Sequence, residues 1–199
     1  MEERVFRPLG MKDTFYGYQD GSSGLAAPPP EKYDRIASWY KPENGKLQKV
    51  PLPDITTLQT WKFISPAGGC YSTASDMFAF YQMVLNGGTY KGVRILSRAA
   101  VEAMTTVQTG DLPASGSAPT PSGPVSRPEA GEGLGWIIRR EPSAAVPLQS
   151  IGSYFKSGGK GTTGWIDPKK DLVVLFLIQR NGGNQRSIFY NMAEAAIVD

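Results

Sequence analysis

The sequence predicts an α+β fold in which helices pack on an antiparallel sheet. Apolar residues recur at helical spacing between residues 73 and 104, whereas short β-rich runs separated by tight turns follow between residues 134 and 179. A further helical pattern closes the chain at residues 185–198. Helical segments followed by a block of consecutive strands are typical of α+β domains, in which helices cover a face of the sheet.

The first fifty residues give weaker signals. Residues 3–7 have helical composition and precede Pro8, which predicts the last turn of a helix that stops there. Residues 20–31 (DGSSGLAAPPPE) have the composition of a loop. Residues 33–49 mix aromatic and polar side chains, which predicts short strands joined through the turn at residues 42–45 (PENG).

The clearest helix is expected to begin after Thr73. Thr73 and Asp76 fit a capping box, in which each side chain accepts a hydrogen bond from the backbone amide of the other residue. Apolar side chains follow at helical spacing, namely Met77, Phe80, Tyr81 and Val84. Residues 86–88 (NGG) supply a left-handed stop, so one face of this helix should belong to the core.

A second helix is predicted to start at Ser97, with Val101 and Met104 on its buried side. The segment after it, residues 109–133, is rich in Pro, Ser, Gly and Ala and cannot bury enough apolar surface to offset its ordering entropy. We therefore expect a flexible surface loop over residues 109–133, inside a single domain that spans residues 1–199.

The strands of the sheet are expected in the last third of the chain. The β-rich runs are residues 134–140, 154–157, 164–167 and 172–179, with a tight turn at residues 167–170 (DPKK). The last three runs should form an antiparallel meander. The closing helix, residues 185–198, carries its apolar side chains on one side, namely Ile188, Met192, Ala195 and Ala196.

Composition excludes several classes of function. The longest apolar run, residues 172–178, is far shorter than the roughly 20 residues of a membrane-spanning helix. We therefore expect no membrane segment. The net charge of +3 is scattered along the chain without a block of like charge, so we also expect no nucleic-acid partner. The absence of histidine excludes Ser-His-Asp triads, and a single cysteine, Cys70, excludes a thiolate zinc cluster. We therefore expect no metal and no cofactor, and chemistry that depends on Ser, Lys, Tyr or carboxylates.

Residues 156–159 carry the groups best suited to bind a substrate. Lys156 supplies a point charge for a carboxylate, and Ser157 supplies a short hydrogen bond. The glycines Gly158 and Gly159 allow a ligand to approach the backbone closely, and the amide of Gly159 could donate to an oxyanion. Spacing alone also allows a plain turn here, because Lys-Ser-Gly-Gly is a common turn composition.

Five segments, in order along the chain, resemble one known family. They are residues 5–14 (VFRPLGMKDT), 66–77 (PAGGCYSTASDM), 133–136 (GLGW), 156–158 (KSG) and the closing pair 165–168 (WIDP) and 172–174 (LVV). Together they resemble serine β-lactamases, D-alanyl-D-alanine carboxypeptidases and related esterases, in the class C-like branch. The resemblance implies part of a β-lactamase/transpeptidase-like fold, and a periplasmic or extracytoplasmic location for the full-length parent.

The resemblance also implies where the nucleophile belongs. In this family it is the serine of a Ser-x-x-Lys motif at a helix start, assisted by a lysine or by the tyrosine of a Tyr-x-Asn motif, and both lie upstream of the Pro-Leu-Gly-Met segment. Here that segment starts at Pro8, and Tyr-x-Asn does not occur. Ser-x-x-Lys starts at Ser38, Ser153 and Ser157, in stretches predicted as strand or turn. We therefore expect no catalytic nucleophile within these 199 residues.

Four further residues have less certain roles. Asn184 and Arg186 follow the last predicted strand, where class C-like relatives place residues that help hold a substrate carboxylate, although a solvated loop is an equal alternative. Lys160 replaces a small residue usual in the family and could either add positive potential to the cleft or face water. Cys70 precedes a helix start, which could lower the pKa of its thiol, or it could be a small buried residue.

The first hypothesis is a C-terminal fragment of a serine hydrolase that acts on β-lactams, D-alanyl peptides or esters through an acyl-enzyme and is inactive by itself. Its ligand would be a small molecule or a peptide. One alternative is a non-catalytic module that binds cell-wall peptides. The other is half of a split enzyme that needs an N-terminal partner chain, in which case an exposed strand edge should cause self-association.

Overall fold

The computed structural model describes residues 1–19, 26–27, 29–50, 69–120, 123–127, 129–180 and 185–197. Helical elements are η1 (Glu2–Phe6), α1 (Arg7–Leu9), η2 (Pro30–Arg35), α3 (Ala74–Leu85), α4 (Arg98–Thr105) and α5 (Gln185–Ala195). The short outer strands are β1 (Phe15–Tyr16), β2 (Tyr18–Gln19), β3 (Ala26–Ala27), β4 (Trp39–Glu43), β5 (Lys46–Val50), β6 (Cys70–Tyr71), β7 (Thr89–Tyr90), β8 (Val93–Arg94), β9 (Ala114–Thr120) and β10 (Gly123–Arg127). The main sheet consists of β11 (Ala130–Glu132), β12 (Ile137–Arg139), β13 (Tyr154–Ser157), β14 (Thr163–Asp167) and β15 (Leu172–Phe176).

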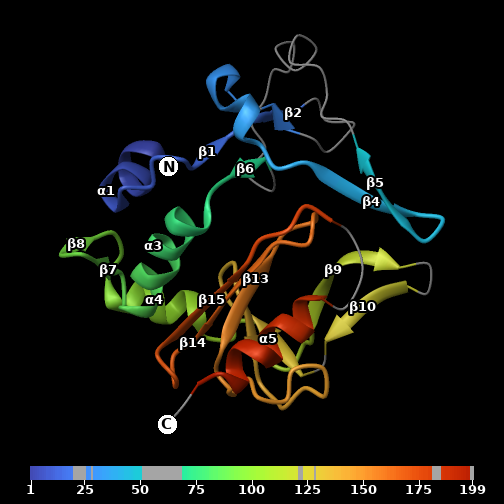
Figure 1. The fold of residues 1–199 in the computed structure, drawn as a ribbon. Helices are drawn as coiled ribbons and strands as arrows, with labels where there is room; N and C mark the ends of the chain where they lie inside the picture. Colours follow the sequence, from blue (N-terminus) through green and yellow to red (C-terminus); the bar gives the residue numbers. More distant parts are fainter. Residues whose placement is uncertain are drawn as a thin grey trace.

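The main sheet is an antiparallel meander in the order β11-β12-β13-β14-β15. The sequence prediction for its last three strands is confirmed. Short connections join β11 to β12, β13 to β14 and β14 to β15, whereas residues 140–153 connect β12 to β13. The turn after β14 is closed by the amide of Lys170 donating to the carbonyl of Asp167 at 3.2 Å. Figure 1 shows the sheet with α5 across one side and α3 beside it.

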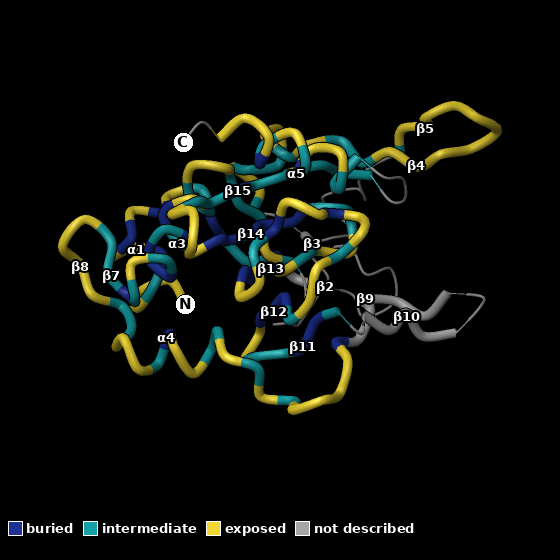
Figure 2. Tube along the Cα trace, turned by 90° about the horizontal axis from the view of Figure 1, so that it is seen from below, coloured by how far each residue is buried: buried dark blue, intermediate teal, exposed yellow. Residues whose placement is uncertain are grey.

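Alternating side chains divide the core into two layers, because successive residues of a strand point to opposite faces. On β13 and β14, Tyr154 and Ile166 pack in the cluster that contains α3, whereas Phe155 and Trp165 pack in the cluster that contains Tyr190 of α5. Figure 2 shows the buried residues along β12 and β14 and the exposed surface of the β4–β5 hairpin. The predicted α+β architecture, with helices on an antiparallel sheet, is therefore confirmed.

Helix α3 begins where the cap predicts, but only half of the capping box forms. The Thr73 hydroxyl accepts a hydrogen bond from the amide of Asp76 at 3.3 Å. The Asp76 carboxylate instead accepts from the amide of Asp13 and the hydroxyl of Thr14, at 2.7 and 2.9 Å. The helix ends at the predicted stop, where Gly87 and Gly88 both have positive φ. The cap therefore also ties the N-terminal segment to α3.

The start of α4 is confirmed, since the Ser97 hydroxyl accepts from the amide of Ala100 at 3.1 Å. The predicted end of the first helical segment is corrected. The helical turns of η1 and α1 continue through Pro8 to Leu9, and Gly10 ends them with φ 72°, in the left-handed conformation that glycine adopts readily.

The apolar side of α5 does not face the sheet. Ile188 and Met192 are 49% and 67% exposed, while Tyr190 and Glu194 are buried. Tyr190 packs on Trp165, with ring centroids 5.0 Å apart, and its hydroxyl donates to the Thr163 hydroxyl at 2.7 Å. A large aromatic side chain with a polar partner thus sets the rotation of α5.

Residues 109–133, predicted as a flexible loop, contain the paired strands β9 and β10 as well as β11. Arg140 anchors the beginning of this segment by donating to the carbonyl oxygens of Gly110 and Leu112. Regular pairing there differs from the loop expected from composition, because backbone hydrogen bonds between strands do not require apolar side chains. The mobility of the segment stays a prediction.

Candidate active-site cleft

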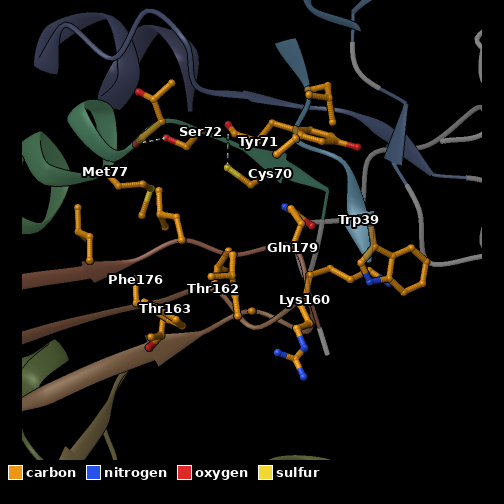
Figure 3. A pocket seen from close by; sticks show the side chains of 18 of the residues that line it. Trp39, Cys70, Tyr71, Ser72, Met77, Lys160, Thr162, Thr163, Phe176 and Gln179 are labelled. Atoms are coloured by element: carbon orange, nitrogen blue, oxygen red, sulfur yellow. Dashed lines mark hydrogen bonds between the residues drawn. The ribbon is translucent and has the colours of Figure 1, made fainter. Parts of the chain in front are cut away.

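A cleft of about 1,000 Å³ lies between the main sheet and the start of α3. Its floor includes Gly164 on β14 and Leu175 on β15, and Tyr81 of α3 lies beside them. Its outer wall includes Trp39 at the start of the β4–β5 hairpin. Figure 3 shows Met77 and Ser72 at one end of this cleft, and Lys160 facing Trp39 at the other.

Lys156 and Ser157 both line the cleft from the end of β13. Lys156 is exposed and lies on the same face of the strand as Tyr154, two residues earlier, which is the face toward α3. In the described residues its ammonium group has no carboxylate within salt-bridge distance. The strand is held in place by the Thr163 hydroxyl, which donates to the Lys156 carbonyl at 3.1 Å.

A tight turn follows Ser157 and shapes the glycine pair. The amide of Gly158 donates to the carbonyl of Thr162 at 2.8 Å. A Cβ on Gly158 would lie 2.5 Å from the Thr162 hydroxyl oxygen, so a larger residue here would force the Thr162 side chain to rotate. Gly159 is exposed, and its amide has no acceptor among the described residues. The turn therefore leaves the Gly159 amide available for a ligand.

On the opposite side of the cleft, hydrogen bonds hold the start of α3 to the N-terminal segment. The hydroxyl groups of Ser72 and Thr14 lie 2.7 Å apart, and both Ser72 and Thr73 line the cleft. Strands β1 and β6 pair alongside, with the Phe15 and Tyr71 rings stacked at 5.3 Å. These contacts join segments that lie about sixty positions apart in the sequence.

An ion cluster stabilises the rim. The Asp13 carboxylate contacts the ammonium of Lys32 at 2.7 Å and the guanidinium of Arg35 at 2.5 and 3.0 Å. Hydrogen bonds from Arg35 and from Lys32 hold the pKa of Asp13 well below its ordinary value. The cluster fixes η2 beside the cleft, and η2 in turn leads into the wall residue Trp39.

This cluster predicts loss of stability in acid. Because folding lowers the pKa of Asp13, its contribution is present above about pH 4 and is lost as the pH falls below that value. We expect Asp13→Asn to be less stable than the wild type at neutral pH, with the difference in free energy of unfolding shrinking steadily as the pH falls below about 4.

Urea denaturation at several pH values measures this difference. Glu43→Gln is the matched control, because the exposed contact of Glu43 with Lys41, at 3.6 Å, should stabilise little at any pH. A difference between Asp13→Asn and wild type that stays constant on acidification would contradict the assignment.

The wall around Trp39 brings Lys160, a candidate from the sequence, together with two residues that the sequence did not indicate. The amide of Tyr40 donates to the carbonyl of Gln179 at 2.9 Å, which docks the hairpin on the segment after β15. The Lys160 ammonium lies 3.5 Å from the centroid of the Trp39 ring. The amide of Arg180 donates to the Lys160 carbonyl at 2.9 Å. Only the close approach of three separate segments reveals Trp39 and Arg180 as cleft residues.

The remaining sequence candidates are placed differently. Asn184 lies outside the described residues. Arg186, on the first turn of α5, is half-buried, but the α5 residue that lines the cleft in the described part is Gln185. Cys70 lies on the cleft wall and is exposed, so it is not the small buried residue that was one of its two expected roles. Desolvation raises the pKa of its thiol, which is opposite to the lowering expected from a helix start.

The three Ser-x-x-Lys serines do not begin helices. Ser38 lies directly before β4, and Ser153 is buried directly before β13. Ser157 ends β13. A serine that precedes or ends a strand does not have the helix-start geometry that the motif requires. The structure therefore gives no support to these three Ser-x-x-Lys matches as catalytic motifs.

The Beta-lactamase family model matches residues 1–198, and the chain therefore belongs to the β-lactamase and penicillin-binding-protein family of serine hydrolases. Protein Rv1367c of Mycobacterium tuberculosis is 32% identical over 186 residues, which cover 90% of this chain and 42% of that protein. A putative D-alanyl-D-alanine carboxypeptidase of Escherichia coli O157:H7 is 25% identical over 192 residues, which cover 89% of this chain and 38% of that protein. The chain thus spans less than half the length of these relatives.

Solved structures agree on the fold. A LovD6 mutant of simvastatin synthase from Aspergillus terreus superposes with a TM-score of 0.70 at 19% identity, covering 98% of this chain and 47% of that one. A penicillin-binding protein homolog from Caulobacter crescentus gives a TM-score of 0.64 at 18% identity, covering 98% of this chain and 51% of that one. The β-lactamase/transpeptidase-like fold expected from the sequence is therefore confirmed.

In the part of the chain that the structure describes, none of the helices is long and apolar enough to cross a membrane. Within the same residues, no three His, Cys, Asp or Glu side chains gather as metal ligands would.

Proposed function

We propose that this chain forms the carboxylate-binding part of a serine hydrolase that acts on β-lactams, D-alanyl peptides or esters through an acyl-enzyme. The observation that carries the proposal is the position of Lys156, exposed at the end of β13 on the cleft side and without a carboxylate partner among the described residues. A lysine favours β-lactam or peptide recognition over simple ester hydrolysis, because both β-lactams and D-alanyl peptides carry a free carboxylate.

Each group of the segment has a physical role. The ammonium of Lys156 attracts the substrate carboxylate, and the hydroxyl of Ser157 donates a hydrogen bond to it. The amide of Gly159 points at no acceptor in the described part, and it donates to the carbonyl oxygen that becomes negative when a nucleophile attacks. In this proposal Asn184 and Arg186 assist from the segment after β15.

The segment supplies neither the nucleophile nor the base that activates it. The proposal therefore assigns substrate binding to the 199 residues and the acylation step to a Ser-x-x-Lys serine outside them. The putative D-alanyl-D-alanine carboxypeptidases among the relatives support this substrate class.

An alternative that requires a partner chain is favoured by a separate observation. In the described part β15 forms one edge of the main sheet, and Ile188 and Met192 expose apolar surface on α5 nearby. An open strand edge beside apolar surface can pair with another chain.

The non-catalytic binding module shares the carboxylate-binding role of Lys156 and differs in having no catalytic partner.

Titration of N-acetyl-D-alanyl-D-alanine into the purified chain tests the proposal. We expect Lys156→Ala to weaken binding about 10- to 100-fold, because a hydrogen bond to a charged group stabilises by about 1.5–3 kcal/mol. Isothermal titration calorimetry measures the affinity. Lys169→Ala is the matched control, since Lys169 is exposed at the turn at the other end of β14.

The outcomes separate clearly. Equal affinity of wild type and Lys156→Ala, or no binding by the wild type, would overturn the assignment of Lys156 as the carboxylate-binding residue.

A further inference from the structure

The charges that line the cleft are strongly unbalanced. Its charged lining side chains in the described residues are Asp13, Lys32, Arg35, Lys156, Lys160 and Arg180. The one acidic group, Asp13, is already bound to Lys32 and Arg35. The three other cations therefore have no carboxylate partner in the described part of the chain, and the proposed function uses only Lys156.

Lys160 and Arg180 are held next to each other by the backbone. The amide of Arg180 donates to the Lys160 carbonyl at 2.9 Å. Between the two segments lies Gly161, with φ 93°, where a Cβ would meet the Arg180 carbonyl oxygen at 2.4 Å. The corner thus depends on glycine, and it is built tightly enough to keep two cationic residues adjacent.

The polar groups of this corner lack acceptors. Lys160 is half-buried, and its ammonium rests on the Trp39 ring, which stabilises the charge but accepts no conventional hydrogen bond. Desolvation lowers the pKa of Lys160. The Nε atom of Arg180 is buried with no acceptor in the described residues. A buried donor without an acceptor and a partly desolvated ammonium both raise the free energy of the empty corner, and an anion that binds there would lower it.

We propose that the corner formed by Lys160 and Arg180 binds a second carboxylate of the ligand whose first carboxylate lies at Lys156. The inference rests on the proposed function and narrows its substrate class to peptides with two carboxylates. Lys160 is four positions after Lys156, so their Cα atoms lie at most about 14 Å apart. One short peptide can span that distance.

Two matched peptides test the proposal. N-succinyl-D-alanyl-D-alanine carries a second carboxylate, and N-succinamoyl-D-alanyl-D-alanine carries a neutral amide at the same position. We expect the wild-type chain to bind the succinyl peptide about tenfold more tightly at low ionic strength, and this preference should shrink as salt is added. Calorimetry measures both affinities.

Variants locate the effect. Lys160→Met keeps the length of the side chain and should remove the preference, as should Arg180→Met, whereas Lys160→Arg retains a cation above Trp39 and should keep it. The amide of Arg180 that anchors the corner is unchanged in all three. The succinamoyl peptide should bind each variant like the wild type, which shows that the variants are folded.

The possible failures are distinguishable. If both peptides bind with equal affinity and binding depends on Lys156, the second carboxylate site is wrong and the proposed function stands. A preference that persists in both Lys160→Met and Arg180→Met would also overturn the second site. If neither peptide binds the wild type, the proposed function is wrong, and the second site falls with it.

Discussion

Gly164→Ala is expected to destabilise the protein by about 3 kcal/mol, the upper end of the cost of overpacking a core. A Cβ at Gly164 would lie 2.3 Å from the Cζ atom and 2.5 Å from the hydroxyl oxygen of Tyr81. The Tyr81 ring is only 4% exposed, and it packs edge-on against Trp136 with centroids 5.3 Å apart. The ring therefore cannot move without opening the contact between α3 and the sheet.

The same change should disturb the cleft. Gly164 pairs with Lys156 in the register of β13 and β14, so a displaced β14 would also displace the lysine. Urea denaturation of the wild type and of each variant measures the free energy of unfolding. Gly159→Ala is the matched control, because no heavy atom lies within 4 Å of its added Cβ, and its stability should change by less than about 1 kcal/mol.

A double variant keeps this prediction testable if Gly164→Ala does not fold. Tyr81→Leu removes the ring atoms that the new methyl group would meet. In that background Gly164→Ala should cost at least about 1 kcal/mol less than in the wild type. Additive costs in the double variant would show that the Tyr81 contact is not the cause.

The purified 199-residue chain is expected to form no covalent adduct with a fluorescent penicillin. Acylation in this family requires a serine next to a lysine or tyrosine base. The three Ser-x-x-Lys serines lie before or at the end of strands, and the chain contains no histidine that could serve as an alternative base. Noncovalent binding through Lys156 can still occur.

Fluorescence of the denatured protein on a gel and its intact mass measure the adduct, with an active penicillin-binding protein as the positive control. Stoichiometric labelling that disappears when one serine is replaced would overturn the prediction. The serines to replace are those that line the cleft, Ser38, Ser72 and Ser157. Labelling lost in Ser72→Ala would place the nucleophile at the start of α3.

Local signals explain which elements were predictable. The cap at Thr73, the glycine stop after α3 and the cap at Ser97 each depend on residues within one helical turn. The strands β13 to β15 depend on β-rich runs and tight turns between neighbours. The candidate segment Lys156-Ser157-Gly158-Gly159 can be predicted from the sequence because its groups are contiguous.

Longer-range contacts explain what was missed. The local pattern predicts that the Asp76 carboxylate completes the cap of its own helix. In the structure it accepts hydrogen bonds from Asp13 and Thr14, more than sixty positions earlier. The spacing of residues places Ile188 and Met192 on one side of α5 but does not show which side packs on the sheet. Tyr190 decides this, because it finds both a ring partner and a hydrogen-bond acceptor on the sheet. No local pattern contains either preference.

By itself the sequence determined the family, through short motifs in a fixed order, and the antiparallel meander, through β-rich runs between tight turns. It also indicated residues 156–159 as candidates for carboxylate binding, because their groups are contiguous in the chain. Only the tertiary structure decided that Lys160, Trp39 and Arg180 share one end of the cleft. Their proximity arises from backbone hydrogen bonds that join the β4–β5 hairpin, the turn after β13 and the segment after β15. Such pairings depend on packing of the whole domain, and the spacing of residues along the chain does not specify them.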